Sequence, residues 1–220
     1  MNISPSKENI LKKIRKALSE STPLPFASSE GNQSVFKPQQ DDLEVLFAEA
    51  FSLLQGKFVF CMNHQELVVQ LDNLIQQRNL KKIVCEESRL RATLVEAAAG
   101  VPALKEFSPG EPGTDLKTCD ASITGCEYLI ARTGTIVLSS AQEKGRTTSV
   151  YAPIHICIAS VDQLVYDVRD GLKMIREKYG NALPSLISFA SGPSRTADIE
   201  KTLVVGVHGP REVYLFLVDK

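Results

Sequence analysis

The sequence predicts an α/β fold in which an open, mainly parallel sheet is flanked by helices, preceded by an N-terminal helix and arm. From residue 41 onward, short runs rich in Val, Ile and Leu alternate with longer segments of helical periodicity. Several helical segments stop at a glycine, such as Gly56, Gly100 and Gly180. Short apolar strands joined through helices are typical of a parallel sheet that is covered on both faces.

Two domains are expected, an N-terminal helix and linker arm over residues 1–40 and an α/β domain over residues 41–220. In the first, Ser4 and Pro5 suit an N-cap and a first helical position, and Ile10, Leu11, Ile14 and Leu18 follow at helical spacing. Residues 21–40 are rich in Pro and Ser, which indicates a linker. Because the linker contains Phe26 and Phe36, the alternative is that these residues pack the arm against the main body or against a second subunit.

Within residues 41–220 the expected elements follow in order. Helices are expected over residues 41–54, 63–78, 88–99, 127–131 and 160–179. Strands are expected over residues 57–61, 81–85, 135–139, 154–159, 186–190 and 213–218. Asn63 with Glu66, and Ser160 with Gln163, form capping-box-like helix starts. The direction of the last two strands stays open.

Composition and charge narrow the function classes. The chain has 25 Lys plus Arg against 26 Asp plus Glu, so it lacks the basic excess of a general nucleic-acid-binding protein. It contains no long uncharged apolar run, and its first residues do not form a signal peptide, so we expect no membrane span and a cytoplasmic location.

The five cysteines, Cys61, Cys85, Cys119, Cys126 and Cys157, form no C-x-x-C pair. Neither a disulfide framework nor a metal or iron-sulfur motif is therefore expected, and structural roles are favoured.

The densest polar segment lies near the C-terminus, where two Gly-Pro turns each carry an arginine, Arg195 and Arg211. A guanidinium group offers a planar, bidentate donor set to a carboxylate or phosphate. We therefore expect these arginines, with Arg146, to bind a small anionic ligand. The alternative is that they bind backbone carbonyls or Asp198 and hold the loops in place.

Histidine, hydroxyl and backbone groups complete the expected ligand site. His208, between Gly206 and Gly209, is the candidate for proton transfer, although a turn histidine bonded to main chain is the alternative. His155 is expected to be a buried core histidine, and Arg195, His208 and Arg211 are expected to share one pocket at the sheet's edge. Further ligand contacts are expected from Thr133, Gly134, Thr135, Ser191, Gly192, Ser194 and Thr196. Ser194 lacks a nucleophile elbow, and no dinucleotide-binding or Walker motif occurs.

Four ordered motifs support a family resemblance. They are residues 123–138 (ITGCEYLIARTGTIVL), Gly145-Arg146, Pro153-Ile154-His155-Ile156, and the two loops around Ser191 and His208. With these motifs the chain resembles the lactate-utilization protein C family, a stand-alone LUD domain. The match is strong over roughly the last hundred residues and extends to the preceding α/β half in pattern only.

The resemblance implies a fold similar to the NagB/RpiA/CoA-transferase group, with ligands at strand ends. It also implies a part without its own cofactor in the oxidation of L-lactate to pyruvate, beside two partner proteins that carry iron-sulfur clusters. Arg132 stands where the family pattern often has an acidic residue. The alternative is an independent enzyme on a sugar-phosphate-isomerase or CoA-transferase-like scaffold that acts on an anionic metabolite.

Overall fold

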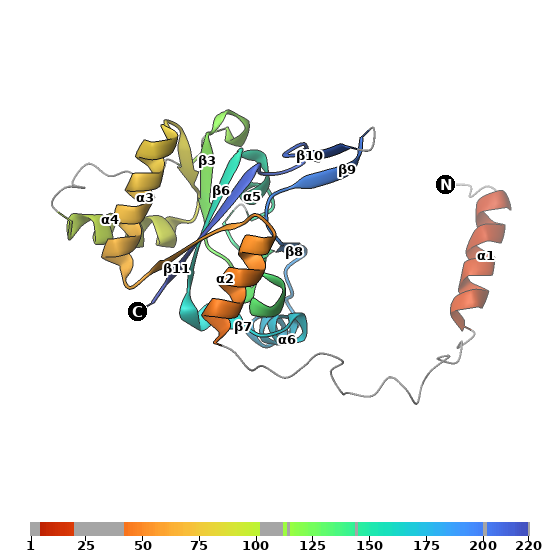
Figure 1. The fold of residues 1–220 in the computed structure, drawn as a ribbon. Helices are drawn as coiled ribbons and strands as arrows, with labels where there is room; N and C mark the ends of the chain where they lie inside the picture. Colours follow the sequence, from red (N-terminus) through yellow and green to blue (C-terminus); the bar gives the residue numbers. More distant parts are fainter. Residues whose placement is uncertain are drawn as a thin grey trace. The chain divides into compact units, whose positions relative to one another are not determined.

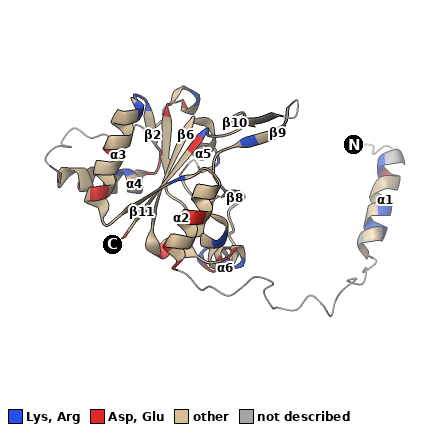
Figure 2. Ribbon diagram, viewed as in Figure 1, with Lys and Arg blue, Asp and Glu red and all other residues tan. Residues whose placement is uncertain are grey.

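The computed structural model describes residues 5–19, 42–101, 112–113, 115–143, 145–199 and 202–219. The chain divides into two units, residues 1–39 and 40–220. Helix α1 (Pro5–Ser19) lies in the first unit, with Glu8 in its first turn and Lys16 in its last, which complements the helix dipole. The charged residues of this helix are drawn in Figure 2. All other elements belong to the second unit (Figure 1).

The larger sheet of the second unit has five strands, all parallel, in the order β1-β11-β6-β3-β2. The strands are β1 (Lys57–Cys61), β2 (Ile83–Cys85), β3 (Ala121–Thr124), β6 (Ile154–Ser160) and β11 (Glu212–Val218). The last strand of the chain therefore inserts between β1 and β6 and sets Leu215 beside Cys157. The parallel direction of β11 answers one question that the sequence left open.

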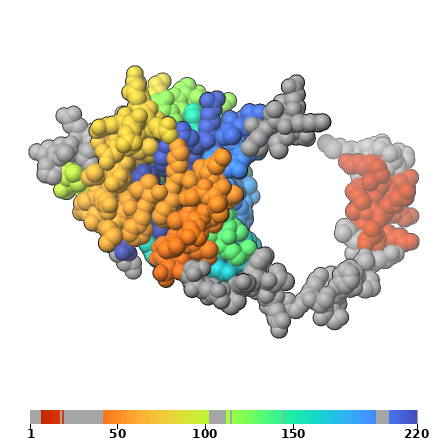
Figure 3. Space-filling model, in the orientation of Figure 1, coloured from red at the N-terminus to blue at the C-terminus, as the bar shows by residue number. Residues whose placement is uncertain are grey.

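The two faces of this sheet are buried against different layers, because successive side chains on a strand point to opposite faces. Phe216 packs with helices α3 (His64–Arg78) and α4 (Ser88–Ala99), whereas Leu215 packs with α2 (Leu43–Leu53) and the smaller sheet. In the space-filling view α2 (orange) and α3 (yellow) adjoin on the face turned to the reader (Figure 3). The predicted α/β fold with a mainly parallel sheet and flanking helices is thus confirmed.

The smaller sheet is mixed and has the strand order β7-β4-β5-β8. Its strands are β4 (Tyr128–Ile130), β5 (Thr135–Ser139), β7 (Leu164–Val165) and β8 (Ile187–Ala190). Strand β5 is antiparallel to both β4 and β8, and helix α6 (Val168–Tyr179) packs on the sheet through Ile175. The remaining elements are the 3-10 helices η2 (Leu116–Thr118), η3 (Ala131–Thr133) and η4 (Val161–Gln163), the short helix α5 (Thr148–Tyr151), and strands β9 (Arg195–Ile199) and β10 (Thr202–Val205).

A buried carboxylate joins α6 to the smaller sheet. The Glu127 side chain is 1% exposed and accepts hydrogen bonds from Lys178 Nζ (2.8 Å), Tyr179 Oη (2.8 Å) and Ser139 Oγ. Lys178 and Tyr179 lie at the end of α6, and Ser139 ends β5. Because a buried charge is tolerated only when it is paired and hydrogen-bonded, this cluster specifies where α6 docks.

The helix start predicted at Asn63 is confirmed. Asn63 Oδ1 accepts from the Glu66 backbone nitrogen at 2.9 Å, and Glu66 Oε2 accepts from the Met62 nitrogen at 2.8 Å. Two unpaired donors at the N-terminus of α3 are thereby satisfied. No helix in the described part of the chain has the length and apolar character needed to cross a bilayer.

Two predicted elements were wrong. Residues 127–131 form strand β4 and the start of η3 instead of a helix, because their short apolar run pairs with β5. The helix expected over residues 160–179 is split. The Ser160–Gln163 capping box is present but closes only the 3-10 turn η4, and a second box of Asp167 and Asp170 begins α6.

The loop between β8 and β11, for which the sequence predicted no regular structure, contains two further strands. Residues 195–199 and 202–205 pair as the antiparallel strands β9 and β10. The expected ion pair between Arg195 and Asp198 lies outside the side chains that the structure describes.

Candidate functional site

A pocket of about 290 Å³ lies where the two sheets meet, and it contains part of the predicted ligand site. Its floor includes His155 and Val213, each the second residue of its strand, so the pocket adjoins the amino-terminal ends of β6 and β11. Leu138 of β5 and Phe189 of β8 bring the smaller sheet to the opposite side. A concave site of this size is in the range of small-molecule pockets.

The two glycine- and proline-rich loops lie side by side along this pocket. The Ser194 nitrogen donates to the Pro210 carbonyl at 2.9 Å, and the Gly206 nitrogen donates to the Ser194 carbonyl at 2.9 Å. A Cβ on Gly209 would lie 2.8 Å from Ser194 Cβ, so a glycine is needed for this approach. The loops are therefore held together by their own backbone bonds.

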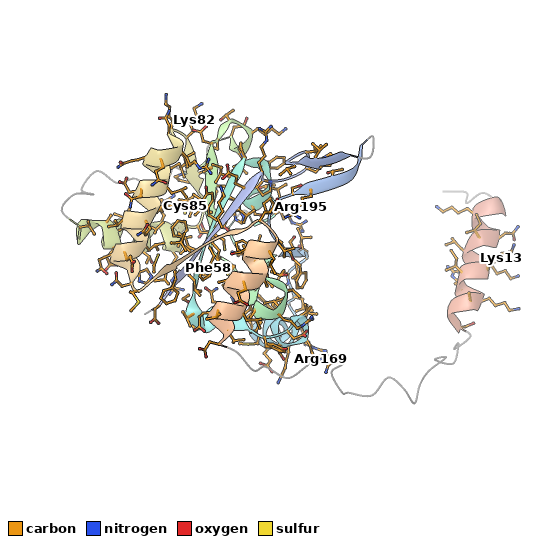
Figure 4. The ribbon with its side chains drawn as sticks, in the orientation of Figure 1. Lys13, Phe58, Lys82, Cys85, Arg169 and Arg195 are labelled. Carbon is orange, nitrogen blue, oxygen red and sulfur yellow. The ribbon has the colours of Figure 1, made fainter. Side chains whose placement is uncertain are left out.

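Four of the ten predicted ligand residues line the pocket and six do not. The four are Arg146, Ser191, Gly192 and Ser194, and the candidate acid-base residue His208 lines it as well. The Arg195 guanidinium donates to the carbonyl of Leu54, which follows α2. Arg195 is the first residue of β9 and is labelled in Figure 4. The Arg211 nitrogen donates to the Pro153 carbonyl at 2.8 Å, and its side-chain stem packs on Gly206. Of the expected trio Arg195, His208 and Arg211, only His208 lines this pocket.

The remaining predicted contacts, Thr133, Gly134, Thr135 and Thr196, are not among the lining residues. Thr196 lies within β9. Thr135 Oγ1 is 2.7 Å from both Thr133 Oγ1 and Ser191 Oγ, so these hydroxyls bond one another. Gly134 has a φ of +56°, and a Cβ there would lie 2.4 Å from the Phe51 nitrogen. This turn therefore joins β5, the loop of Ser191 and helix α2.

His155 is a lining residue that the sequence did not suggest as a ligand contact. Its side chain is buried, and Nε2 lies 2.8 Å from Thr124 Oγ1 on the neighbouring strand β3. Burial lowers the pKa of His155 to about 4, so the imidazole is neutral at pH 7. The signal for this pair lies in the register between β3 and β6, which the sequence does not contain.

A second, smaller hollow of about 10 Å³ shares Leu138, Gly145 and Ser149 with the pocket and has room for about one water. Glu87 lines it and accepts from the Gly125 nitrogen at 2.8 Å, while burial raises the pKa of its carboxyl. Glu143 also lines it and accepts from the Ser88 nitrogen at 3.0 Å, a backbone bond that lowers the pKa of Glu143. Both carboxylates thus accept from backbone donors, and neither lines the main pocket.

Arg132 takes part in a structural ion pair. Its Nε lies 2.8 Å from Asp167 Oδ2, and its backbone nitrogen donates to the Tyr166 carbonyl at 3.1 Å. Because Asp167 is the N-cap of α6, the pair ties η3 to that helix. Arg132 is not among the residues that line the pocket.

The charge of the pocket suits an anion. Among the described residues that line it, Arg146 is the one with a full charge at pH 7, and Ser149, Ser191 and Ser194 add hydroxyls. Gly192 and Gly209 also line the pocket, and their backbone nitrogens donate to no described residue. In the described part of the chain, no three His, Cys, Asp or Glu side chains gather as a metal site would require.

Comparison with known proteins places the chain in a family. A family model described as the LUD domain matches residues 45–218. Lactate utilization protein C of Deinococcus radiodurans is 36% identical over 136 residues, 58% of this chain and 63% of that protein. Lactate utilization protein C 1 of Bacillus mycoides is 30% identical over 189 residues, 82% of this chain and 80% of that protein.

Two further comparisons bear on length and fold. Lactate utilization protein C of Bacillus subtilis is 36% identical over 160 residues, 70% of this chain and 63% of that protein, so the match spans less than two thirds of that relative, as it does of the D. radiodurans protein. The crystal structure of a DUF162 family protein from D. radiodurans has a TM-score of 0.56 at 22% identity, over 80% of this chain and 96% of that chain. This likeness shows a shared fold.

Proposed function

Because the chain belongs to the LUD domain family, we propose that it is a component of a lactate-utilization system. The observation that carries the proposal is the 30% identity, over 82% of the chain, to a protein named Lactate utilization protein C 1. Within the system we assign it to the oxidation of L-lactate to pyruvate, beside two iron-sulfur partner proteins.

The cysteine distribution supports a division of labour with such partners. All five cysteines are free and buried, and they lie on separate strands and turns. An iron-sulfur cluster generally needs four thiolates at one place. We therefore assign the clusters to the partners and none to this chain, and free cysteines favour a cytoplasmic location.

In this proposal the pocket binds a small carboxylate- or phosphate-bearing molecule. Arg146 supplies the charge, the serine hydroxyls and the backbone nitrogens of Gly192 and Gly209 supply further donors, and no carboxylate of a described residue lines the pocket to oppose an anion. His208, which is exposed at the rim, is the candidate to exchange a proton with the ligand.

The system-level test is reconstitution. The full chain would be combined with the two iron-sulfur proteins, and lactate-dependent electron transfer to an artificial acceptor would be measured with and without it. We expect a rate that depends on this chain. Equal rates in both mixtures would refute the proposal, and turnover of an anionic metabolite by the isolated chain would favour an independent enzyme.

The pocket-level test compares three arginines. Calorimetry with L-lactate, pyruvate, phosphate and coenzyme A would be run on wild type and on Arg146→Ala, Arg195→Ala and Arg211→Ala. A charge-assisted contact is worth about 1.5 to 3 kcal/mol, so Arg146→Ala should weaken binding about ten- to a hundredfold. Arg195→Ala serves as the control, because its guanidinium binds the Leu54 carbonyl. If Arg195→Ala alone weakened ligand binding, the ligand would have to bind outside this pocket, which would refute this assignment.

A further inference from the structure

A second cavity of about 330 Å³, which we call the outer pocket, adjoins the main pocket at His208. It is lined by Val150, Tyr151, Gly206, Val207, His208 and Gly209. Three of these residues, Val150, His208 and Gly209, also line the main pocket. A ligand that is bound in the main pocket can therefore extend past His208 into the outer pocket.

The side chains around the outer pocket offer an aromatic and aliphatic surface. Tyr151 is 48% exposed, and Val150 and Val207 are 40% and 43% exposed. Lys117 Nζ lies 5.7 Å from the centre of the Tyr151 ring, a cation–π distance that helps to hold this ring in place. None of the described residues that line the outer pocket is Lys, Arg, Asp or Glu. Exposed apolar side chains around a concave space are typical of a binding site for an uncharged part of a ligand.

The order of the groups along the two pockets matches the substituents of a 2-hydroxy acid. Arg146 lines the main pocket, His208 lines both pockets, and Tyr151 lines the outer pocket. A 2-hydroxy acid carries a carboxylate, a hydroxyl and a side chain on one carbon atom. With the carboxylate at Arg146 and the hydroxyl near His208, the side chain extends into the outer pocket.

L-lactate is too small to use both pockets. Its side chain is a methyl group, and the main pocket of about 290 Å³ has the volume of about ten waters, more than a three-carbon acid fills. An aromatic side chain is large enough to cover the exposed ring of Tyr151, and a pair of aromatic rings stabilises binding beyond the burial of its area. The lining of the outer pocket therefore favours an aromatic side chain over a methyl group.

We infer that the outer pocket is a side-chain subsite and that the chain binds 2-hydroxy acids with an aromatic side chain in preference to L-lactate. The inference rests on the proposed function in one respect, that the ligand is a carboxylate held by Arg146. Burial of a phenyl ring against Tyr151 should make L-3-phenyllactate bind about ten- to a hundredfold more tightly than L-lactate.

The affinity test is calorimetry at pH 7 on the full chain with L-lactate and L-3-phenyllactate, which differ by one phenyl ring. Tyr151→Ala removes the aromatic wall, and Val207→Trp fills the outer pocket. Each variant should weaken phenyllactate binding and bring the ratio of the two affinities to within about threefold. Phe60→Ala is the matched control, because Phe60 of β1 is 40% exposed and lines neither pocket, so this variant should keep the wild-type ratio. Arg146→Ala should weaken the binding of both acids by the same factor.

The outcomes separate the subsite from the proposed function. Equal affinities of the two acids for wild type, or a ratio that Tyr151→Ala and Val207→Trp both keep, would overturn the inference and leave the lactate role in place. Binding of neither acid would overturn the inference together with the anion site of the main pocket. A preference for phenyllactate that depends on Tyr151, combined with a failed reconstitution, would support the subsite and refute the lactate role.

A second measurement locates the phenyl ring directly, because the sequence contains no tryptophan. Tyr151→Trp keeps an aromatic wall and introduces a single tryptophan, whose fluorescence reports on its surroundings. L-3-phenyllactate should shift this emission to shorter wavelength, whereas L-lactate should leave it unchanged. Phe60→Trp is the control, and its emission should respond to neither acid. An unchanged emission of Tyr151→Trp at a phenyllactate concentration that saturates binding in calorimetry would overturn the inference.

Discussion

Replacement of Glu127 by Gln should destabilise the fold, because this carboxylate joins α6 to the smaller sheet. Its side chain is 1% exposed and accepts from Lys178, Tyr179 and Ser139. Gln keeps the shape and one acceptor oxygen, and the two hydroxyls can reorient. The ion pair with Lys178 is lost, and the amide hydrogens of Gln face a cation.

The size of the effect follows from the lost charged hydrogen bonds. A hydrogen bond to a charged group contributes about 1.5 to 3 kcal/mol, so we expect a loss of about 2 kcal/mol in the free energy of unfolding. Lys178 is half-exposed and can turn to water, which keeps the loss below that of breaking a fully buried pair. For a urea slope of about 2 kcal/mol per molar, the unfolding midpoint falls by about 1 M.

The pH dependence has a definite sign. Burial acts to raise the pKa of Glu127, but the hydrogen bonds from Lys178, Ser139 and Tyr179 outweigh it, and the pKa lies below its ordinary 4.5. A carboxylate with a lowered folded-state pKa contributes stability above the unfolded pKa and loses it as pH falls through the folded pKa. The gap between wild type and Glu127→Gln should therefore be constant from about pH 6 to 8 and shrink below about 4.5.

The assay is urea unfolding followed by circular dichroism, with Glu177→Gln as control. Glu177 lies on the same helix in an exposed pair with Lys173 at 3.9 Å, and its replacement should cost less than about 0.5 kcal/mol. If both variants lose the same small amount, or if the Glu127→Gln gap grows as the pH falls, the reasoning about this cluster is refuted.

Two further predictions concern the backbone and the buried histidine. Gly134→Ala should cost about 3 kcal/mol of unfolding free energy, because φ is +56° and a Cβ would lie 2.4 Å from the Phe51 nitrogen, whereas Gly113→Ala, with φ +78° and open space, should cost about 1 kcal/mol. Equal midpoint shifts in thermal unfolding would contradict the close approach of α2. Burial lowers the pKa of His155 to about 4 from 6.5, so its contribution to stability is complete above pH 6.5 and falls by about 3 kcal/mol as pH drops to 4. His155→Gln should remove this slope and His64→Gln should keep it, as measured by urea unfolding at several pH values; parallel profiles for all three proteins would contradict the assignment.

Local pattern was enough to predict the fold class and many of its elements. The apolar run of β11 and the capping pair of Asn63 and Glu66 are written in neighbouring residues, and the structure shows both. Local pattern predicted the wrong element where a helix signal and a strand-forming run lie in the same segment. Ser160 and Gln163 do form a capping box, yet the chain leaves the helix after one turn because Leu164 and Val165 pair with β4. A strand partner far along the chain thus overrides a local helix signal.

The candidate site divides in the same way. The residue pattern predicts that polar glycine-rich loops flank the last two predicted strands, and four residues expected in these loops, Ser191, Gly192, Ser194 and His208, line the pocket. Two contacts could not be predicted in this way: Arg195 binds the carbonyl of Leu54, 141 residues earlier, and His155 contacts Thr124 across the register of β3 and β6. The group that a hydrogen-bond donor meets, and the face of the sheet on which a side chain lies, depend on which strands become neighbours. Parallel pairing between distant segments cannot be predicted from the spacing of neighbouring residues.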